Sequence, residues 1–280
     1  MMLSHIPSGH APRRADSFGR ISRAVVKIGT NVLTTESGAP ALTVVGSLVK
    51  DLADWHQAGH RVVLVSSGAV AMGVEKLGWD NPPTTIHGRQ VCAAVGQGEL
   101  MRLYAFLFGR QELVAGQILL THHDLVNPER RTEVAKTIEG LLTSGVIPVI
   151  NANDAVDSTE LLRADGEGNV YGDNDCLAMM VAQSVCAEAL VYLTDVDGVL
   201  SADWVEGANR KGQLLSYAGV DENGLPSKGG VGGMKSKVSC AKNLQECGIE
   251  CVIANGRKPG VIRNVLRGEE EGTWFPVTTN

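Results

Sequence analysis

Aromatic side chains are scarce in this sequence, at 4% of its 280 residues. A folded core must therefore be built mainly from Val, Leu, Ile and Ala. Hydrophobic residues still make up 44% of the chain and charged residues 20%, so a sizeable core is available and global disorder is excluded. The length suits one large domain or two closely associated lobes.

An excess of basic residues is also lacking, since the formal net charge is −6. This balance argues against nucleic acid as the main partner, because a phosphate backbone requires a basic protein face. The cysteines form no Cys-x-x-Cys pair and have no nearby histidine at zinc-ligand spacing. They are typical of small reduced core residues in a cytoplasmic protein, and they are Cys92, Cys176, Cys186, Cys240, Cys247 and Cys251.

Membrane-spanning and targeting segments are not evident either. The stretch that most resembles a membrane span in composition is 176–193. Gln183, Ser184 and Glu188 interrupt it, so a helix followed by a strand explains it better. The first 20 residues lack the apolar run of a signal peptide. Their prolines, glycines and arginines favour a disordered tail over residues 1–20, with a mitochondrial transit peptide as the alternative.

Short aliphatic runs alternate with amphipathic helical patterns from residue 22 onward. The runs lack polar alternation, which predicts strands buried on both faces. We therefore expect an α/β fold, a three-layer sandwich with a central, mainly parallel sheet. The predicted strands are 24–26, 61–65, 114–120, 146–150, 190–193, 250–254 and 273–277, and the predicted helices include 43–58 with Thr43 as N-cap, 69–77, 89–108, one opened by Asn127-Pro128, one near Cys176, 234–247 and 259–267; residues 155–171 are expected to form a hairpin.

Polar motifs follow several of the predicted strands. In open parallel sheets, ligands bind beyond the carboxyl ends of the strands. The recurrence of such motifs at four strand ends therefore favours a binding site there. The motifs are Lys27-Ile28-Gly29-Thr30, Ser66-Ser67-Gly68, Asn151-Ala152-Asn153-Asp154 and Thr194-Asp195.

Two lysines stand beside glycines that suit phosphate binding. Lys27 is at a strand exit, where exposed N–H groups can cradle an anion. Lys237 lies one turn into a helix preceded by four glycines, and the N-terminal dipole of that helix favours anions. A surface lysine beside a turn and a flexible linker are the alternatives. Together the motifs suggest phosphoryl transfer by positioning and charge neutralisation.

Two further clusters are open to more than one interpretation. Asp173-Asn174-Asp175 stands at a predicted helix start, where one side chain suffices for capping and three suggest another role. His122-His123-Asp124 resembles a metal site in composition, but adjacent residues rarely converge on one ion. We expect no metal held by the protein itself.

Seven segments together resemble the amino acid kinase family, and within it the members that phosphorylate glutamate. The resemblance spans about residues 23–277, and the joint presence of the segments in this order is specific. It implies one kinase domain over 21–280, with a substrate lobe over about 21–190 and a nucleotide lobe over about 191–280, and no room for the C-terminal PUA domain of many relatives. The segments are 25–30, 65–70, 93–97, 148–156, 172–175, 194–195 and 232–237.

The resemblance also implies roles for individual residues. Lys27 and Lys237 would contact the transferring phosphate, and Asp175 would hold both lysines. Ser67, Asp154 and Asn174 would bind L-glutamate, while Mg²⁺ would bridge the phosphates of ATP. The nucleotide site would comprise Lys27, Thr194, Asp195, Val231, Gly232, Gly233, Met234, Lys235, Ser236 and Lys237.

The chain differs from the usual family pattern at two places. Ala152 stands where the family usually has Glu, and Glu133-Val134-Ala135 replaces a common Asn-Ala-Arg stretch. The family also implies feedback inhibition by proline, which these changes would affect. Two alternatives to a kinase for glutamate remain: a kinase of the same fold that acts on another carboxylate or phosphate, and a non-catalytic ligand sensor. We expect a homo-oligomer, although apolar helical faces within 89–142 suit a core equally well.

Overall fold

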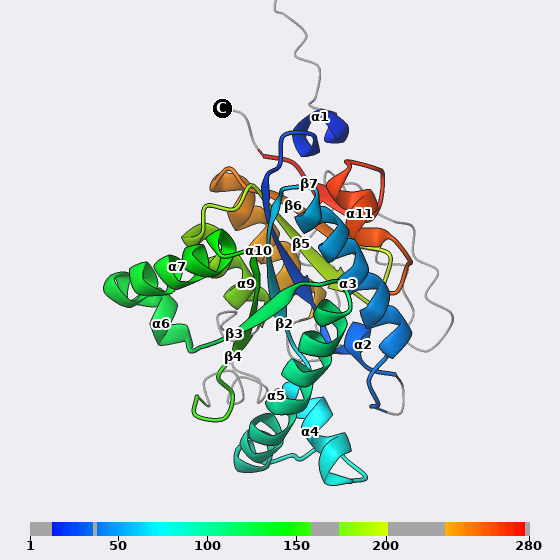
Figure 1. The fold of residues 1–280 in the computed structure, drawn as a ribbon, viewed down its shortest axis with the longest axis vertical. Coiled ribbons are helices and arrows are strands. Elements are labelled where there is room, and N and C mark those ends of the chain that lie inside the picture. Colours follow the sequence, from blue (N-terminus) through cyan, green and yellow to red (C-terminus); the bar gives the residue numbers. More distant parts are fainter. Residues whose placement is uncertain (1–12, 36–37, 158–173, 201–232, 278–280) are drawn as a thin grey trace, which may run out of the picture.

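The computed structural model describes residues 13–35, 38–157, 174–200 and 233–277. A seven-stranded sheet forms the middle of this part of the chain, in the order β3-β4-β2-β1-β5-β6-β7 (Figure 1). Neighbouring strands are parallel except β6 and β7, which are antiparallel. The strands are β1 (Arg23–Ile28), β2 (Arg61–Ser66), β3 (Val114–Leu120), β4 (Val146–Ala152), β5 (Ala189–Thr194), β6 (Glu250–Asn255) and β7 (Thr273–Phe275).

Helices cover both faces of the sheet (Figure 1). One core cluster joins the sheet to α1–α5 and α11, and a second joins it to α6, α7, α9 and α10. The predicted three-layer α/β sandwich is thereby confirmed. The helices are α1 (Arg14–Phe18), α2 (Thr30–Leu33), α3 (Leu42–Gln57), α4 (Ala69–Leu77), α5 (Ile86–Gly109), α6 (His122–Val126), α7 (Pro128–Thr143), α9 (Asn174–Ser184), α10 (Met234–Glu246) and α11 (Val261–Leu266).

The alternation of side chains along β1 directs its lysine to one layer of helices. Val26 and Ile28 belong to the core cluster beneath α3 and α5, whereas Val25 belongs to the cluster beneath α9 and α10. Successive side chains of a strand point to opposite faces. Lys27 therefore shares the face of Val25 and is directed toward α9 and α10.

Most helix boundaries lie within a few residues of the predicted ones. Asn127 caps α7 as predicted, because its Oδ1 accepts hydrogen bonds from the N–H groups of Glu129 and Arg130 at 3.0 and 3.1 Å. The prediction of Thr43 as an N-cap is wrong, since α3 begins one residue earlier and has no side-chain cap. The predicted hairpin at 155–171 falls largely outside the described residues.

The predicted tail is wrong for residues 14–18, which form α1. Phe18 is 2% exposed and packs edge-on against Trp274, with 6.5 Å between the ring centroids. Arg14 lies over the Phe18 ring, and burial lowers the pKa of its guanidinium to about 10. One aromatic anchor is thus enough to dock a segment rich in Arg and Gly. Residues 1–12 lie outside the described part of the chain.

The longest helix of the described residues is apolar enough to cross a membrane by length and composition alone. This helix is α5, and not the stretch 176–193 that most resembled a membrane span in the sequence. In the fold it packs against α3, α4 and β3 and buries Leu100, Tyr104 and Phe108 in the core. A core helix meets the same criteria, so its packing accounts for its composition.

Candidate active site

The carboxyl ends of β4, β2, β1, β5 and β6 are neighbours at one edge of the sheet. Backbone hydrogen bonds continue beyond the strand ends. The N–H of Ser67 donates to the carbonyl of Ile28 at 3.0 Å, and the N–H of Gly29 donates to the carbonyl of Leu193 at 3.1 Å. The loops after the strands are therefore held side by side, and the four polar motifs selected from the sequence lie along this edge.

Two buried lysines share one buried carboxylate at this edge. Lys27 Nζ lies 2.6 Å from Oδ1 of Asp175, and Lys237 Nζ lies 2.8 Å from Oδ2 of the same residue. The side chain of Asp175 is 0% exposed and those of Lys27 and Lys237 are 5% and 9% exposed. The structure thus joins β1, α9 and α10 through three charged side chains from distant parts of the sequence.

Burial alone would raise the pKa of Asp175. The charges of Lys237 and Lys27, together with their hydrogen bonds, instead lower the pKa of this carboxyl below its usual value. Asp175 is therefore ionised at neutral pH, and two ammonium groups face a single carboxylate. Charge-assisted hydrogen bonds from such ammonium groups suit phosphate oxygens.

The amino end of α10 adds backbone donors beside these lysines. The helix begins at Met234 after Gly233, and Lys237 lies in its first turn. The first N–H groups of a helix carry the positive end of its dipole and favour anions. Ser236 is 9% exposed, and its buried Oγ has no hydrogen-bond partner among the described residues. Val231 and Gly232 lie outside the described residues.

The three residues assigned to substrate binding lie at two strand ends and one helix start. Ser67 follows β2 and is 9% exposed. Asp154 follows β4, and burial, with the charge of Asp157, raises the pKa of its carboxyl to about 6. Asn174 opens α9, which packs against both strands, and within the described part of the chain its buried Oδ1 has no hydrogen-bond partner. A cationic group near Asp154 would stabilise the ionised carboxylate and lower its pKa again.

Gln97 is a candidate that the sequence analysis quoted only inside a motif. Its Oε1 accepts a hydrogen bond from Asn151 Nδ2 at 2.8 Å, while its buried Nε2 has no partner in the residues that the structure describes. Gly96 lies against the start of α4, where a Cβ would stand 1.8 Å from the carbonyl oxygen of Ala69. Gln97 is thus held near the ends of β2 and β4 with a free donor. The available signal was a polar side chain within an apolar helix.

Polar contacts also connect the ends of β1, β5 and β6. Asn31 Nδ2 donates to Asp195 Oδ2 at 3.4 Å, and Thr194 Oγ1 donates to Asp195 Oδ1 at 3.3 Å. Arg257 Nη2 donates to the carbonyl oxygen of Asn31 at 2.7 Å. Thr194 and Asp195 were expected here from their motif, whereas Asn31 and Arg257 become their neighbours only through the strand order.

The model of the amino acid kinase family matches residues 22–255. The chain belongs to the amino acid kinase family. It is 42% identical to the glutamate 5-kinase of Symbiobacterium thermophilum over 90% of this chain and 95% of that protein. The glutamate 5-kinase of Myxococcus xanthus is also 42% identical, over 99% of this chain and 71% of that protein. That of Clostridium acetobutylicum is 38% identical over 94% and 97%.

Solved structures of other kinases share the fold. An isopentenyl phosphate kinase matches 90% of this chain and 99% of its own, with a TM-score of 0.58 and 16% identity. The UMP kinase of Bacillus anthracis matches 92% and 97%, with the same TM-score and identity. These likenesses support the amino acid kinase architecture and say nothing of the substrate.

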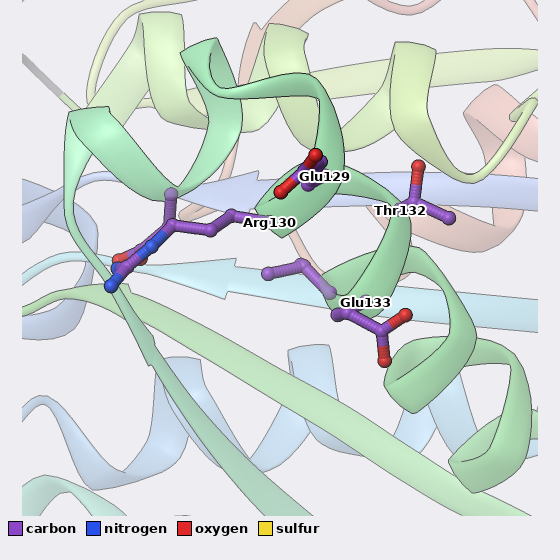
Figure 2. A pocket seen from close by; sticks show the side chains of 6 residues that line it. Glu129, Arg130, Thr132 and Glu133 are labelled. Carbon is purple, nitrogen blue, oxygen red and sulfur yellow. The ribbon is translucent and has the colours of Figure 1, made fainter.

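Glu133 and Val134, which belong to the stretch expected to depart from the family pattern, line an open pocket of about 680 Å³ beside α7. Figure 2 shows Glu133 on α7, and Val134 follows it in the lining. Lys27, Asp175 and Lys237 are not part of this pocket. The residues that line it are Asp124, Glu129, Arg130, Thr132, Glu133 and Val134.

Asp124 of the His122-His123-Asp124 motif has a structural role. Asp124 Oδ2 accepts hydrogen bonds from the N–H and the hydroxyl of Thr121 at 2.8 and 2.7 Å, which completes a capping box for α6. Its Oδ1 pairs with Arg130 at 2.6 Å. Within the described residues, no three His, Cys, Asp or Glu side chains are grouped to hold a metal ion.

Proposed function

We propose that this protein transfers the γ-phosphoryl group of ATP to the side-chain carboxylate of L-glutamate, giving γ-glutamyl 5-phosphate and ADP, the first step of proline biosynthesis. The observation that carries the reaction type is the buried Lys27–Asp175–Lys237 group. The choice of glutamate is supported by the relatives, which are glutamate 5-kinases with up to 42% identity over nearly all of this chain.

The chemistry requires charge neutralisation more than proton transfer. A glutamate side chain is already ionised at pH 7, because its usual pKa is about 4.3, so no general base is needed. One carboxylate oxygen attacks the γ-phosphorus, and the bond between that phosphorus and the bridging oxygen breaks as ADP leaves. Lys27 and Lys237 reduce the repulsion between the two anions and stabilise charge on the transferring group. Asp175 keeps both ammonium groups in position.

Substrate binding is assigned to the acceptor end of the same edge. In the proposal, Asp154 pairs with the α-ammonium group of glutamate, and Ser67 and Asn174 donate hydrogen bonds to its carboxylates. Gln97 joins this set because its buried Nε2 needs an acceptor. These neutral donors suit carboxylate oxygens, while Asp154 selects a substrate that carries a cation.

Nucleotide binding is assigned to the neighbouring strand ends and the start of α10. The proposed set is the one implied by the resemblance, from Thr194 and Asp195 to residues 231–237, with Lys27. Mg²⁺ is proposed to arrive with ATP, held chiefly by phosphate oxygens, as is usual for this ion. The described residues offer no three-ligand protein cage, so no step is assigned to the metal.

Three further properties belong to the same proposal. The protein is proposed to act in the cytoplasm and to respond to proline as a feedback inhibitor, with Ala152 and Glu133 altering that response. It is also proposed to form a homo-oligomer. The last point is supported by apolar side chains on α5 and edge strand β3, of which Phe106 and Val114 are 61% and 64% exposed.

A product-trapping assay tests the function. The enzyme is incubated with Mg²⁺-ATP and L-glutamate, L-aspartate, N-acetyl-L-glutamate or glutarate, and hydroxylamine converts any acyl phosphate into a coloured hydroxamate. We expect L-glutamate to give the highest kcat/KM and glutarate, which lacks the ammonium group, to react poorly. Preference for an acceptor without an ammonium group, or no turnover with any acceptor, contradicts the proposal.

A further inference from the structure

Two buried thiols face each other between α9 and α10. Cys176 Sγ and Cys240 Sγ are 3.4 Å apart, and the two residues are 2% and 3% exposed. Cys176 directly follows Asp175, and Cys240 lies about one helical turn after Lys237. The two helices that join Asp175 to Lys237 therefore also bring two sulfur atoms into contact.

We infer that Cys176 and Cys240 are an oxidisable pair whose disulfide bond links α9 to α10 and lowers the activity of the enzyme. The assignment of these two residues as the site of oxidation depends only on the distance between their sulfur atoms. Its effect on activity rests on the proposed function, because it concerns the helices that carry Asp175 and Lys237.

The sulfur atoms need to move only a short distance to react. A disulfide bond is about 2.05 Å long, so the thiols must approach by about 1.4 Å. With hydrogen peroxide as oxidant, one thiolate attacks a peroxide oxygen and becomes a sulfenic acid, releasing the first water. The second sulfur then displaces the sulfenic hydroxyl, which leaves as the second water. Two thiols are oxidised, and one peroxide is reduced to two waters.

The other cysteines are poorer partners for either thiol. None of the six forms a disulfide bond within the described residues, and Cys186 and Cys247 are exposed rather than buried. Cys251 is buried near the pair, but burial, with the nearby Cys240, raises the pKa of its thiol well above the usual value. It therefore remains protonated, and a thiol is a weaker nucleophile than a thiolate. Packing alone would explain two small buried side chains, but oxidation can distinguish the two interpretations.

The link is expected to act on the nearby ion group. Drawing the sulfurs together moves α9 against α10, and with them the backbones that carry Asp175 and Lys237. A misplacement on the order of 1 Å costs about 10²-fold in rate when it disturbs reacting groups. We therefore expect kcat to fall by at least about 10-fold in the oxidised enzyme.

The experiment uses the full chain with Cys186→Ser and Cys247→Ser, which removes the exposed thiols. The folded protein is treated with hydrogen peroxide, denatured and capped with N-ethylmaleimide, and then weighed intact and as peptides. We expect two fewer capped thiols, a peptide pair linked through Cys176 and Cys240, and a parallel loss of activity. Dithiothreitol should restore both readouts.

The protein with Cys186→Ser and Cys247→Ser is the parent for matched variants, which test whether the link is specific to one pair of cysteines. Cys176→Ala and Cys240→Ala should each prevent the link and keep most activity after peroxide, whereas Cys251→Ala should behave like the parent. Absence of the link in the folded parent, a link through Cys251, or a link without loss of activity overturns the inference. If an alanine variant fails to fold, peptide mapping of the parent still decides. A parent that never phosphorylates glutamate contradicts the proposed function but leaves the mass readout intact.

Discussion

At the scale of single residues, the site depends on one carboxylate with two partners. Asp175 accepts from Lys27 on one oxygen and from Lys237 on the other. Removing one lysine leaves the buried carboxylate paired with the remaining lysine, so the fold is expected to tolerate the change. Catalysis should not tolerate it, because each ammonium group is assigned to the transferring phosphate.

The first prediction is that Lys27→Ala and Lys237→Ala each lower kcat by about 10²–10³-fold and change the KM for glutamate little. Losing a charge directed at the transition state removes stabilisation that the ground state does not use. Lys50→Ala is the control, since Lys50 lies on α3 in an exposed pair with Asp54. Steady-state kinetics alongside thermal unfolding provides the measurement. Near-normal turnover in both site variants contradicts the mechanism.

The second prediction concerns pH. The pKa of Asp154 is raised to about 6 in the absence of substrate, whereas pairing with an ammonium group requires the ionised form. As pH falls from 7.5 to 5, Asp154 becomes protonated, and kcat/KM for glutamate should fall by about 10-fold per pH unit below the pKa. Above pH 7, where Asp154 is already ionised, the profile should be flat.

Two variants test whether Asp154 is the titrating group. Asp154→Asn should weaken glutamate binding by about 10- to 150-fold, the value of one charged hydrogen bond, and remove the inflection near pH 6. Asp157→Asn should move the inflection to lower pH, because the charge of Asp157 contributes to the raised pKa of Asp154. An inflection that survives in Asp154→Asn assigns the titration to another residue.

The sequence was informative for residues whose role depends on local context. Lys27 follows an aliphatic run, Asp175 stands at a helix start and Lys237 follows glycines, so each carries its own signal. Arg257 carries none, and Gln97 carries only that of a polar side chain within an apolar helix, because their relation to the site arises from how α5 and β6 pack against elements distant in sequence. Such residues are found by structure.

At the scale of elements, α1 shows how composition can mislead. Arg and Gly around residues 13–20 favoured disorder, yet Phe18 inserts into the core beside Trp274. A single aromatic ring buries enough surface to hold a five-residue helix. The same limitation explains α2 and α6, short helices that the sequence did not predict because periodicity needs more residues to be recognised.

The third prediction is that Phe18→Ala lowers the free energy of unfolding by about 3–5 kcal/mol, the usual cost of emptying a buried aromatic site. Urea denaturation of the full chain measures it. Arg13→Ala is the control, because the Arg13 side chain is 87% exposed and its pair with Asp16 lies at the surface. We expect the control to change the free energy by less than about 0.5 kcal/mol. Equal stability of the two variants would restore the interpretation of this segment as a tail.

At the scale of the whole molecule, large apolar side chains are exposed on α5 and on the strand β3 that it packs against. Phe106 on α5 and Val114 on β3 are mostly exposed, and β3 is the edge strand of the sheet. A hydrophobic edge strand with open hydrogen-bonding groups invites association. A second copy of the chain is the occupant proposed above.

The fourth prediction is that Phe106→Glu shifts the protein to a smaller assembly, because a charge placed in an apolar contact must be desolvated. Light scattering coupled to size-exclusion chromatography measures the mass. Leu42→Glu is the control, since Leu42 is 59% exposed at the start of α3. A monomeric native protein, or an equal effect of both changes, excludes this face as the contact.

The position of β1 also has a consequence for synthesis on the ribosome. β1 lies between β2 and β5, and the N–H of Arg23 on β1 bonds to Glu188, 165 positions along the chain. One edge of β1 can pair with β2 early in synthesis, but its other hydrogen-bonding edge stays uncovered until β5 has been made. Such long-range pairing folds slowly and leaves partly built sheets open to aggregation. The nascent chain is therefore most vulnerable between the emergence of β2 and the arrival of β5.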